Sequence, residues 1–374
     1  MSQQSGSQVR RAKLVFLLVA GAVGISLLVV GIYQGVEFTD STAFCGVLCH
    51  DVMYPEYTTY QESPHSSVAC AECHVGSGAD YLVKSKLSGI PLVFTTIAKT
   101  YDRPIPTPVK DLRPARETCE QCHRPDIFSG DIVRVNTTFL TDETNTPEVS
   151  TLIMHVGAGE AEVAHGIHWH IAAKVWYLAL DEQRQWIVWV GVEDDSGQIQ
   201  TEYIDQDASI EITPELIQKG KRLMDCIDCH NRATHIFSSP EELIDTALVQ
   251  GKLDADLPYI KREAIKALDP PNASLEEAYS KVEAISEFYR ANYPEVYNEE
   301  QSAIENAVIE LKEIARLTTF PFMGVTYNTY LDNINHFEAP ACMRCHGKLI
   351  ATSGEQEGRT ISVGCNLCHD IVSP

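Results

Sequence analysis

The spacing of the cysteines constrains this chain more than any other feature of its sequence. All twelve cysteines fall in six short clusters, and a histidine follows directly after each cluster. Three residues separate the cysteines in the first cluster, Cys45-Gly-Val-Leu-Cys49-His50, whereas two residues separate them in the others. Those five clusters are Cys70 and Cys73 with His74, Cys119 and Cys122 with His123, Cys226 and Cys229 with His230, Cys342 and Cys345 with His346, and Cys365 and Cys368 with His369.

The five regular clusters match the Cys-x-x-Cys-His pattern by which c-type haem is attached. Two thiols a short turn apart can reach the two vinyl groups of one porphyrin, and the adjacent histidine then lies under the iron as an axial ligand. Zinc sites and disulfides are the alternatives, but neither needs a histidine directly after each cysteine pair. The sequence therefore predicts a multihaem cytochrome c in which these five histidines bind iron.

The first cluster differs because one extra residue widens the loop between its cysteines. The wider loop need not prevent two thioether bonds, so we expect Cys45 and Cys49 to carry a sixth haem; a free cysteine pair or a disulfide is the alternative. Met53 lies close by and offers a thioether to the iron, and methionine ligation raises the reduction potential relative to two histidines. A haem with this different ligand set is the expected point of electron entry.

An uncharged, mostly apolar run extends from Leu14 to Val36 and is long enough to cross a bilayer as a helix. Arg10, Arg11 and Lys13 precede it, which predicts a cytoplasmic N-terminus and a single-pass anchor in a bacterial cytoplasmic membrane. A cleaved signal peptide is the alternative, but the run is longer than a signal core and no small-residue cleavage site follows it. The haem region is then expected on the periplasmic or extracytoplasmic side.

The expected fold is mixed and mainly α. It comprises an N-terminal transmembrane helix, a haem-packed core with little secondary structure, a small antiparallel β insertion and a helical C-terminal region. The predicted boundaries are 1–13 for the cytoplasmic N-terminus, 14–36 for the anchor, 37–130 for a three-haem region, 131–210 for the β insertion with a histidine cluster, 211–237 for the fourth haem, 238–320 for the helical region and 321–374 for the last two haems.

Local signals support this division of the chain. Residues 132–140, 175–180, 186–192 and 199–204 are rich in β-branched and aromatic residues, which favours strands. Thr213-Pro214, Ser239-Pro240 and Ser274-x-x-Glu277 are typical helix starts. We expect the first of these helices to run to Met224 and the second to end at Gly251. Ile304, Val308, Leu311 and Ala315 indicate a further helix.

Seven histidines lie outside the clusters, and five haems with two imidazoles each would need five of them as distal ligands. His65, His235 and His336 are the first candidates, since His235 and His336 lie close in sequence to a haem cluster. The dense stretch His165-Gly-Ile-His168-Trp-His170 is expected to supply one or two more. For His155, a surface or core position is as well supported as a role as iron ligand.

The N-terminal part resembles the NapC/NirT family of membrane quinol dehydrogenases. The anchor, the first cluster with its methionine and Tyr54-Pro-Glu-Tyr57 carry the resemblance, together with residues 63–74, the third haem cluster and residues 226–235. It implies that Met53 replaces His50 as iron ligand on a haem that faces quinol, and that Lys84 or Lys86 helps to form the quinol pocket. The family pattern is His-x-Met, whereas here two residues separate His50 from Met53. Four-haem members also carry a histidine on the helix before the fourth haem, and residues 213–225 contain none.

The resemblance implies a protein that oxidises menaquinol from the membrane quinol pool. It would pass electrons through about six c-type haems to a periplasmic cytochrome or reductase in anaerobic respiration. A tethered electron carrier without its own quinol site is one alternative. A terminal oxyanion reductase is another, although the sequence has no Cys-x-x-Cys-Lys motif. The formal net charge of −23 argues against a nucleic-acid partner.

Overall fold

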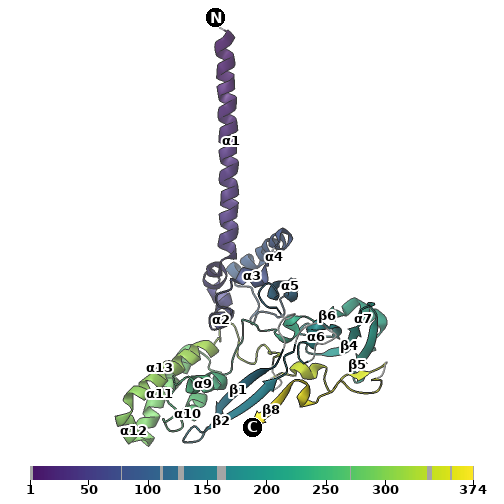
Figure 1. The fold of residues 1–374 in the computed structure, drawn as a ribbon. Coiled ribbons are helices and arrows are strands. Elements are labelled where there is room, and N and C mark those ends of the chain that lie inside the picture. Colours follow the sequence, from purple (N-terminus) through teal and green to yellow (C-terminus); the bar gives the residue numbers. More distant parts are fainter. Residues whose placement is uncertain are drawn as a thin grey trace.

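The computed structural model describes residues 3–76, 78–109, 113–124, 130–157, 166–269, 271–334, 339–353 and 356–373. A single long helix, α1 (Gln3–Asp40), extends away from the rest of the molecule (Figure 1). Residues 10–40 of this helix are the one segment in the described part of the chain that is long and apolar enough to cross a membrane. The helix extends beyond the apolar run 14–36 at both ends.

Short helices at the base of α1 carry the first three cysteine clusters. They are the π-helix η1 (Ala43–Leu48), α2 (His50–Gln61), α3 (Cys70–His74) and α5 (Ala115–Cys119). A twenty-residue helix, α4 (Ala79–Ala98), lies between α3 and α5 in the sequence and next to the base of α1 in space (Figure 1).

The described chain forms two antiparallel sheets. One contains β1 (Ile132–Phe139), β2 (Pro147–Met154) and β8 (His369–Ser373) in the order β1-β2-β8. The other has the order β6-β3-β4-β5-β7 and contains β3 (Lys174–Ala179), β4 (Ile187–Glu193), β5 (Ile199–Ile204), β6 (Arg222–Leu223) and β7 (Ile350–Ala351).

These sheets differ from the single β insertion predicted for 131–210. The four expected strands are present, but β2 was missed, and β6, β7 and β8 come from the regions of the fourth, fifth and sixth clusters. Residues 131–210 therefore pair with distant segments. Short edge strands that pair only after the chain has folded leave little local signal.

Short helices connect the sheets to the remaining clusters. They are α6 (Trp169–Ala172), α7 (Pro214–Gly220), α8 (Cys226–Cys229) and the 3₁₀ helices η2 (Ala341–Arg344) and η3 (Cys365–Leu367). Thr213 caps α7 as predicted, since its side chain accepts a hydrogen bond from the Leu216 amide. The expected continuation to Met224 is wrong, because α7 ends at Gly220 and the chain then pairs with β3 as β6. A Cβ at Gly220 would lie 2.6 Å from Leu178, so glycine permits this close approach.

The helical region contains the largest hydrophobic core of the described chain. It comprises α9 (Pro240–Val249), α10 (Ile260–Leu268), α11 (Leu275–Asn292), α12 (Pro294–Glu299) and α13 (Gln301–Thr318). Ser239 and Ser274 cap α9 and α11, and Gly251 follows α9 with a positive φ, as the sequence predicted. Ala278, Val282, Ile285 and Tyr289 of α11 are buried against α10 and α13.

A buried lysine joins the helical region to the β1–β2 hairpin. Lys261 is 1% exposed, and its Nζ donates to the Phe139 carbonyl at the end of β1 and binds Asp245 on α9. In the hairpin, the Asn145 side chain donates to the carbonyls of Ala255 and Leu257 and accepts from the Lys261 amide. These bonds fix the helical region to the hairpin because a buried charge must keep its partners.

Replacing Lys261 by methionine should therefore lower the free energy of unfolding by about 3–5 kcal/mol, because Asp245 would remain buried without its cation. Denaturant unfolding followed by far-UV circular dichroism measures this change. Lys266→Met is the control on the same helix, since Lys266 pairs with Glu263 at an exposed position and should contribute less than about 1 kcal/mol. Equal effects of the two substitutions would contradict this prediction.

Candidate haem and membrane-side site

The first cluster lies in a π-helical turn at the base of the anchor. A π-helix bonds residue i to i+5 and so holds one more residue per turn than an α-helix. The turn Ala43–Leu48 thus accommodates the third residue between Cys45 and Cys49. The Met53 amide donates to the Cys49 carbonyl one turn later, so the two side chains lie on the same face of α2. The wider spacing is therefore compatible with attachment of both thiols, Cys45 and Cys49, to one haem.

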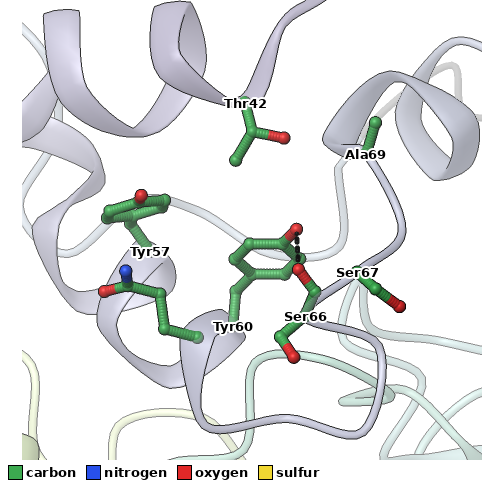
Figure 2. Close-up of a pocket in the computed structure, with 7 residues that line it drawn as sticks. Thr42, Tyr57, Tyr60, Ser66, Ser67 and Ala69 are labelled. Carbon is green, nitrogen blue, oxygen red and sulfur yellow. Dashed lines mark hydrogen bonds between the residues drawn. The ribbon is translucent and has the colours of Figure 1, made fainter.

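Gly46 is required at this turn by a close contact. A Cβ at Gly46 would lie 2.2–2.7 Å from the ring of Tyr57, so the backbone of η1 packs directly against that ring. Tyr57 also lines a pocket with a volume of about 380 Å³, within the range of small-molecule sites (Figure 2). The other residues that line it are Thr42, Tyr60, Gln61, Ser66, Ser67 and Ala69.

The pocket lies beside the thiols of two clusters. Ala69 directly precedes Cys70, and the Cys45 thiol and Thr42 lie near the Cys70 thiol, where both lower its pKa. Tyr60 closes one side of the pocket, because its hydroxyl donates to the Ser66 carbonyl at 2.6 Å (Figure 2) and to the Val68 carbonyl at 3.0 Å. The pocket is therefore formed by the segment that links the first cluster to the second.

The predicted membrane-side residues are spread around this region. Lys86 on α4 donates to Thr39 at 2.8 Å and pairs with Asp40, so it joins α4 to the last turn of α1. Lys84 is exposed on α4, and Met53 packs against a cluster that includes Phe320 and Met323. None of the three predicted residues is among those that line the pocket. Asp40 was not predicted; it follows Glu37 as the second acidic residue after the uncharged run 14–36.

Histidines from distant parts of the chain face one another in pairs. Each described pair joins a histidine of a cysteine cluster to one of the predicted distal histidines. The ring centroids are 6.3 Å apart for His74 and His235, 6.0 Å for His123 and His65, 6.4 Å for His230 and His168, and 5.9 Å for His346 and His170.

This separation fits a metal ion between the two rings. With a metal–nitrogen bond of about 2.0 Å on each side, two imidazoles on one iron would hold their ring centres roughly 6 Å apart. The backbone orients several rings for this role, because an Nδ1–H that donates to a carbonyl leaves Nε2 free to bind. Such contacts are made by His65 to Ala233, His170 to Ile167, His235 to Glu56 and His346 to Ser362, at 2.5–3.2 Å.

Burial keeps most of these rings in the neutral form that binds metals. It lowers the pKa of His74, His168, His170 and His230, and it lowers the pKa of His235 to about 4.

His155 behaves differently. Its two ring nitrogens face Asp131 and Asp370 at 3.2 and 3.3 Å, and the hydrogen bond to Asp131 raises its pKa. His155 is therefore bound to carboxylates on both sides and is not placed as a ligand.

Four predicted iron ligands remain to be located in the structure: His50, His165, His336 and His369. His369 begins β8 and pairs with Met154 of β2. His165 and His336 lie outside the described residues, as does the side chain of His50, whose backbone begins α2.

Cysteine clusters that follow one another in the sequence are also neighbours in space. Besides Cys45 near Cys70, the helix α3 of the second cluster contacts α5 of the third, and α5 contacts α8 of the fourth. Farther along, Cys229 interacts with Cys345, and Cys342 with Cys368. None of the twelve cysteines, all of which the structure describes, forms a disulfide. The clusters form a continuous row from the anchor to the C-terminal region.

A buried polar network fixes the fourth cluster to the fifth. Asp228, between Cys226 and Cys229, accepts hydrogen bonds from Tyr177 at 2.7 Å and Arg184 at 3.0 Å. Arg344, between Cys342 and Cys345, donates to the Asp228 carbonyl at 2.6 Å and is 7% exposed. The residues between the cysteines thus set the distance between two neighbouring clusters.

Comparison with known proteins agrees with this arrangement. Residues 7–106 match the model of the N-terminal region of the NapC/NirT cytochrome c family. Cytochrome c-type protein ImcH of Geobacter sulfurreducens is 44% identical over 365 residues, which cover 97% of this chain and 71% of ImcH. The chain belongs to the NapC/NirT cytochrome c family. As a family member with six cysteine clusters, it is a multihaem c-type cytochrome with an apolar N-terminal helix. No solved structure matches it.

Replacing Gly46 by alanine should displace the Tyr57 ring and destabilise the first cluster, at a cost of about 1–3 kcal/mol. Denaturant unfolding and the haem content measured by intact mass report the change. Gly89→Ala is the control, since nothing lies within 4 Å of a Cβ at that position. An alanine at Gly46 that changes neither stability nor haem content would refute the packing argument.

Proposed function

We propose that this NapC/NirT family member oxidises quinol at the membrane and passes the electrons through six haems to an extracytoplasmic redox partner. The observation that carries the proposal is the set of four facing histidine pairs at the separation required by an iron. The haems supply one-electron chemistry, and the protein supplies their ligands, spacing and environment.

In this proposal the four described pairs would hold the irons of the second to fifth haems. His235, His65, His168 and His170 would bind them together with His74, His123, His230 and His346, respectively. His165 and His336 are the candidates to complete the sixth site at His369. At the first site Met53 or His50 binds the iron.

Two imidazoles on one iron leave no open position for an oxyanion substrate. These four sites are therefore suited to electron transfer, which argues against a terminal reductase. The row of neighbouring cysteine clusters offers a route from the base of the anchor to the C-terminal strands. An electron that enters at the first cluster would reach each later site through its neighbour.

Quinol, and menaquinol in particular, is the proposed donor because the first cluster lies where the anchor ends. Oxidation of one quinol releases two electrons to the haem row and two protons to water. The pocket beside Tyr57 and the pair Lys86–Asp40 both lie at this level. The family resemblance supports the same assignment. A tethered carrier reduced by another membrane complex remains the competing proposal, and the donor experiment distinguishes the two.

Anaerobic mixing of the oxidised, detergent-solubilised protein with a reduced menaquinone analogue tests the donor. We expect rapid reduction of the haem absorption bands that a quinol-site inhibitor blocks. Met53→Ala and Lys86→Met should each slow it by about tenfold, or roughly 1.4 kcal/mol in the barrier. Lys174→Met is the matched control, because Lys174 forms its ion pair with Glu193 in the distant five-stranded sheet. Reduction by dithionite without reduction by the quinol would favour the tethered carrier.

Removing one distal histidine tests the ligand assignment. His170→Ala should convert one low-spin haem to high spin in the electron paramagnetic resonance spectrum, because His346 would lose the ring opposite it. Intact mass should still show six haems, since the thioether bonds are unchanged. His155→Ala is the control and should leave the spin state of every haem unchanged, because carboxylates bind both nitrogens of His155. A spin-state change in His155→Ala but not in His170→Ala would refute the assignment.

A further inference from the structure

The helix α4 presents an apolar surface that no described part of the chain covers. All twenty of its residues are described, and none is buried. Seven of its large apolar side chains are 45–75% exposed, which is unusual for a helix of a folded domain. These residues are Val83, Leu87, Ile90, Leu92, Val93, Phe94 and Ile97.

The exposed residues form a stripe along one face. Val83, Leu87, Ile90, Phe94 and Ile97 follow one another at intervals of four and three residues, which places them on one side of a helix. The series one residue farther on is mixed, with Lys84, Ser88 and Thr95 beside Pro91 and Ala98, and the exposed Leu92 lies on the side opposite the stripe. The helix therefore has one continuous apolar face and a partly polar one. Because it also contains charged residues, it resembles helices that lie along a membrane surface.

The position of α4 identifies the surface that would cover this stripe. Lys86 bonds to Thr39 and Asp40, which belong to the last turn of the anchor, so α4 is held at the level where the anchor ends. Figure 1 shows α4 beside the base of α1. Val47 and Leu48 of η1 are also exposed at the base of the anchor, by 56% and 64%. The apolar surface thus continues from the membrane helix onto the haem region.

We propose that α4 lies along the surface of the bilayer that α1 crosses, with its apolar stripe inserted among the lipid acyl chains. Lys84 and Lys99 then lie at the level of the lipid headgroups, where basic side chains interact favourably with anionic lipids. The haem region is attached to the membrane at two places, by α1 and by α4. This second attachment fixes its orientation and keeps the first cysteine cluster at the lipid boundary.

Spin labels on single added cysteines test this proposal in the full haem-loaded chain. The native cysteines are held in thioether bonds, and labelling of the unsubstituted protein measures any background. Phe94→Cys and Ile97→Cys place labels on the stripe, and Ser88→Cys places one on the polar face. Val133→Cys is the matched control, because Val133 is 64% exposed on β1, away from the anchor. Each protein is reconstituted in vesicles of phosphatidylethanolamine and phosphatidylglycerol.

The measurement compares collisions of each label with oxygen, which concentrates in lipid, and with a water-soluble nickel chelate. We expect labels at positions 94 and 97 to be several-fold less accessible to nickel than those at 88 and 133, while remaining accessible to oxygen. Nickel accessibility at 94 and 97 equal to that at 133 would overturn the proposal. Shielding from both reagents would also overturn it, because it would show that a protein partner or a second copy covers the stripe.

Discussion

The interaction on which much of this structure depends is the pairing of a histidine that follows a cysteine cluster with a histidine from a distant part of the chain. The cluster supplies one imidazole locally, whereas the second ring of each pair comes from elsewhere in the chain. His74 meets His235, and His123 meets His65, whose ring is in turn held by the Ala233 carbonyl. The segment that follows the fourth cluster is therefore drawn back against the second and third. The fold connects these regions through histidine pairs rather than through a large sheet or helix bundle.

This pairing also explains where the hydrophobic core lies. In the described part of the first 124 residues, Val52, Tyr60 and Ala115 are the buried hydrophobic residues, whereas the helical region buries a large cluster of its own. A chain region with so little apolar interior gains little from side-chain burial alone. Covalently attached porphyrins are large and apolar, and they would fill the space between the histidine pairs. The helical region has no cysteine cluster and forms a conventional core instead.

The two ends of the haem row are built differently. Near the membrane, Lys86 and Asp40 join α4 to the anchor, and a π-helical turn accommodates the extra residue of the first cluster. Farther away, Asp228 and Arg344 join the fourth and fifth clusters through buried hydrogen bonds, and the last strands of the chain add to both sheets. A buried charge is costly unless its partners stay in place, so such a network favours one fixed spacing between neighbouring haems. Fixed spacing is what a chain of electron transfers requires.

The sequence by itself determined the features that arise from neighbouring residues. The cysteine clusters, the anchor and the helix starts at Ser239 and Ser274 depend on groups only a few residues apart, so their spacing was sufficient evidence. It also limited the candidate distal ligands to the histidines outside the clusters, but it could not pair them with cluster histidines. Only the tertiary structure decided that His168 faces His230 while His170 faces His346, that His155 lies between two carboxylates, and that β7 and β8 join sheets formed much earlier in the chain. The physical reason is that these contacts join residues far apart in sequence, and no local pattern records which distant partner the folded chain brings to each one.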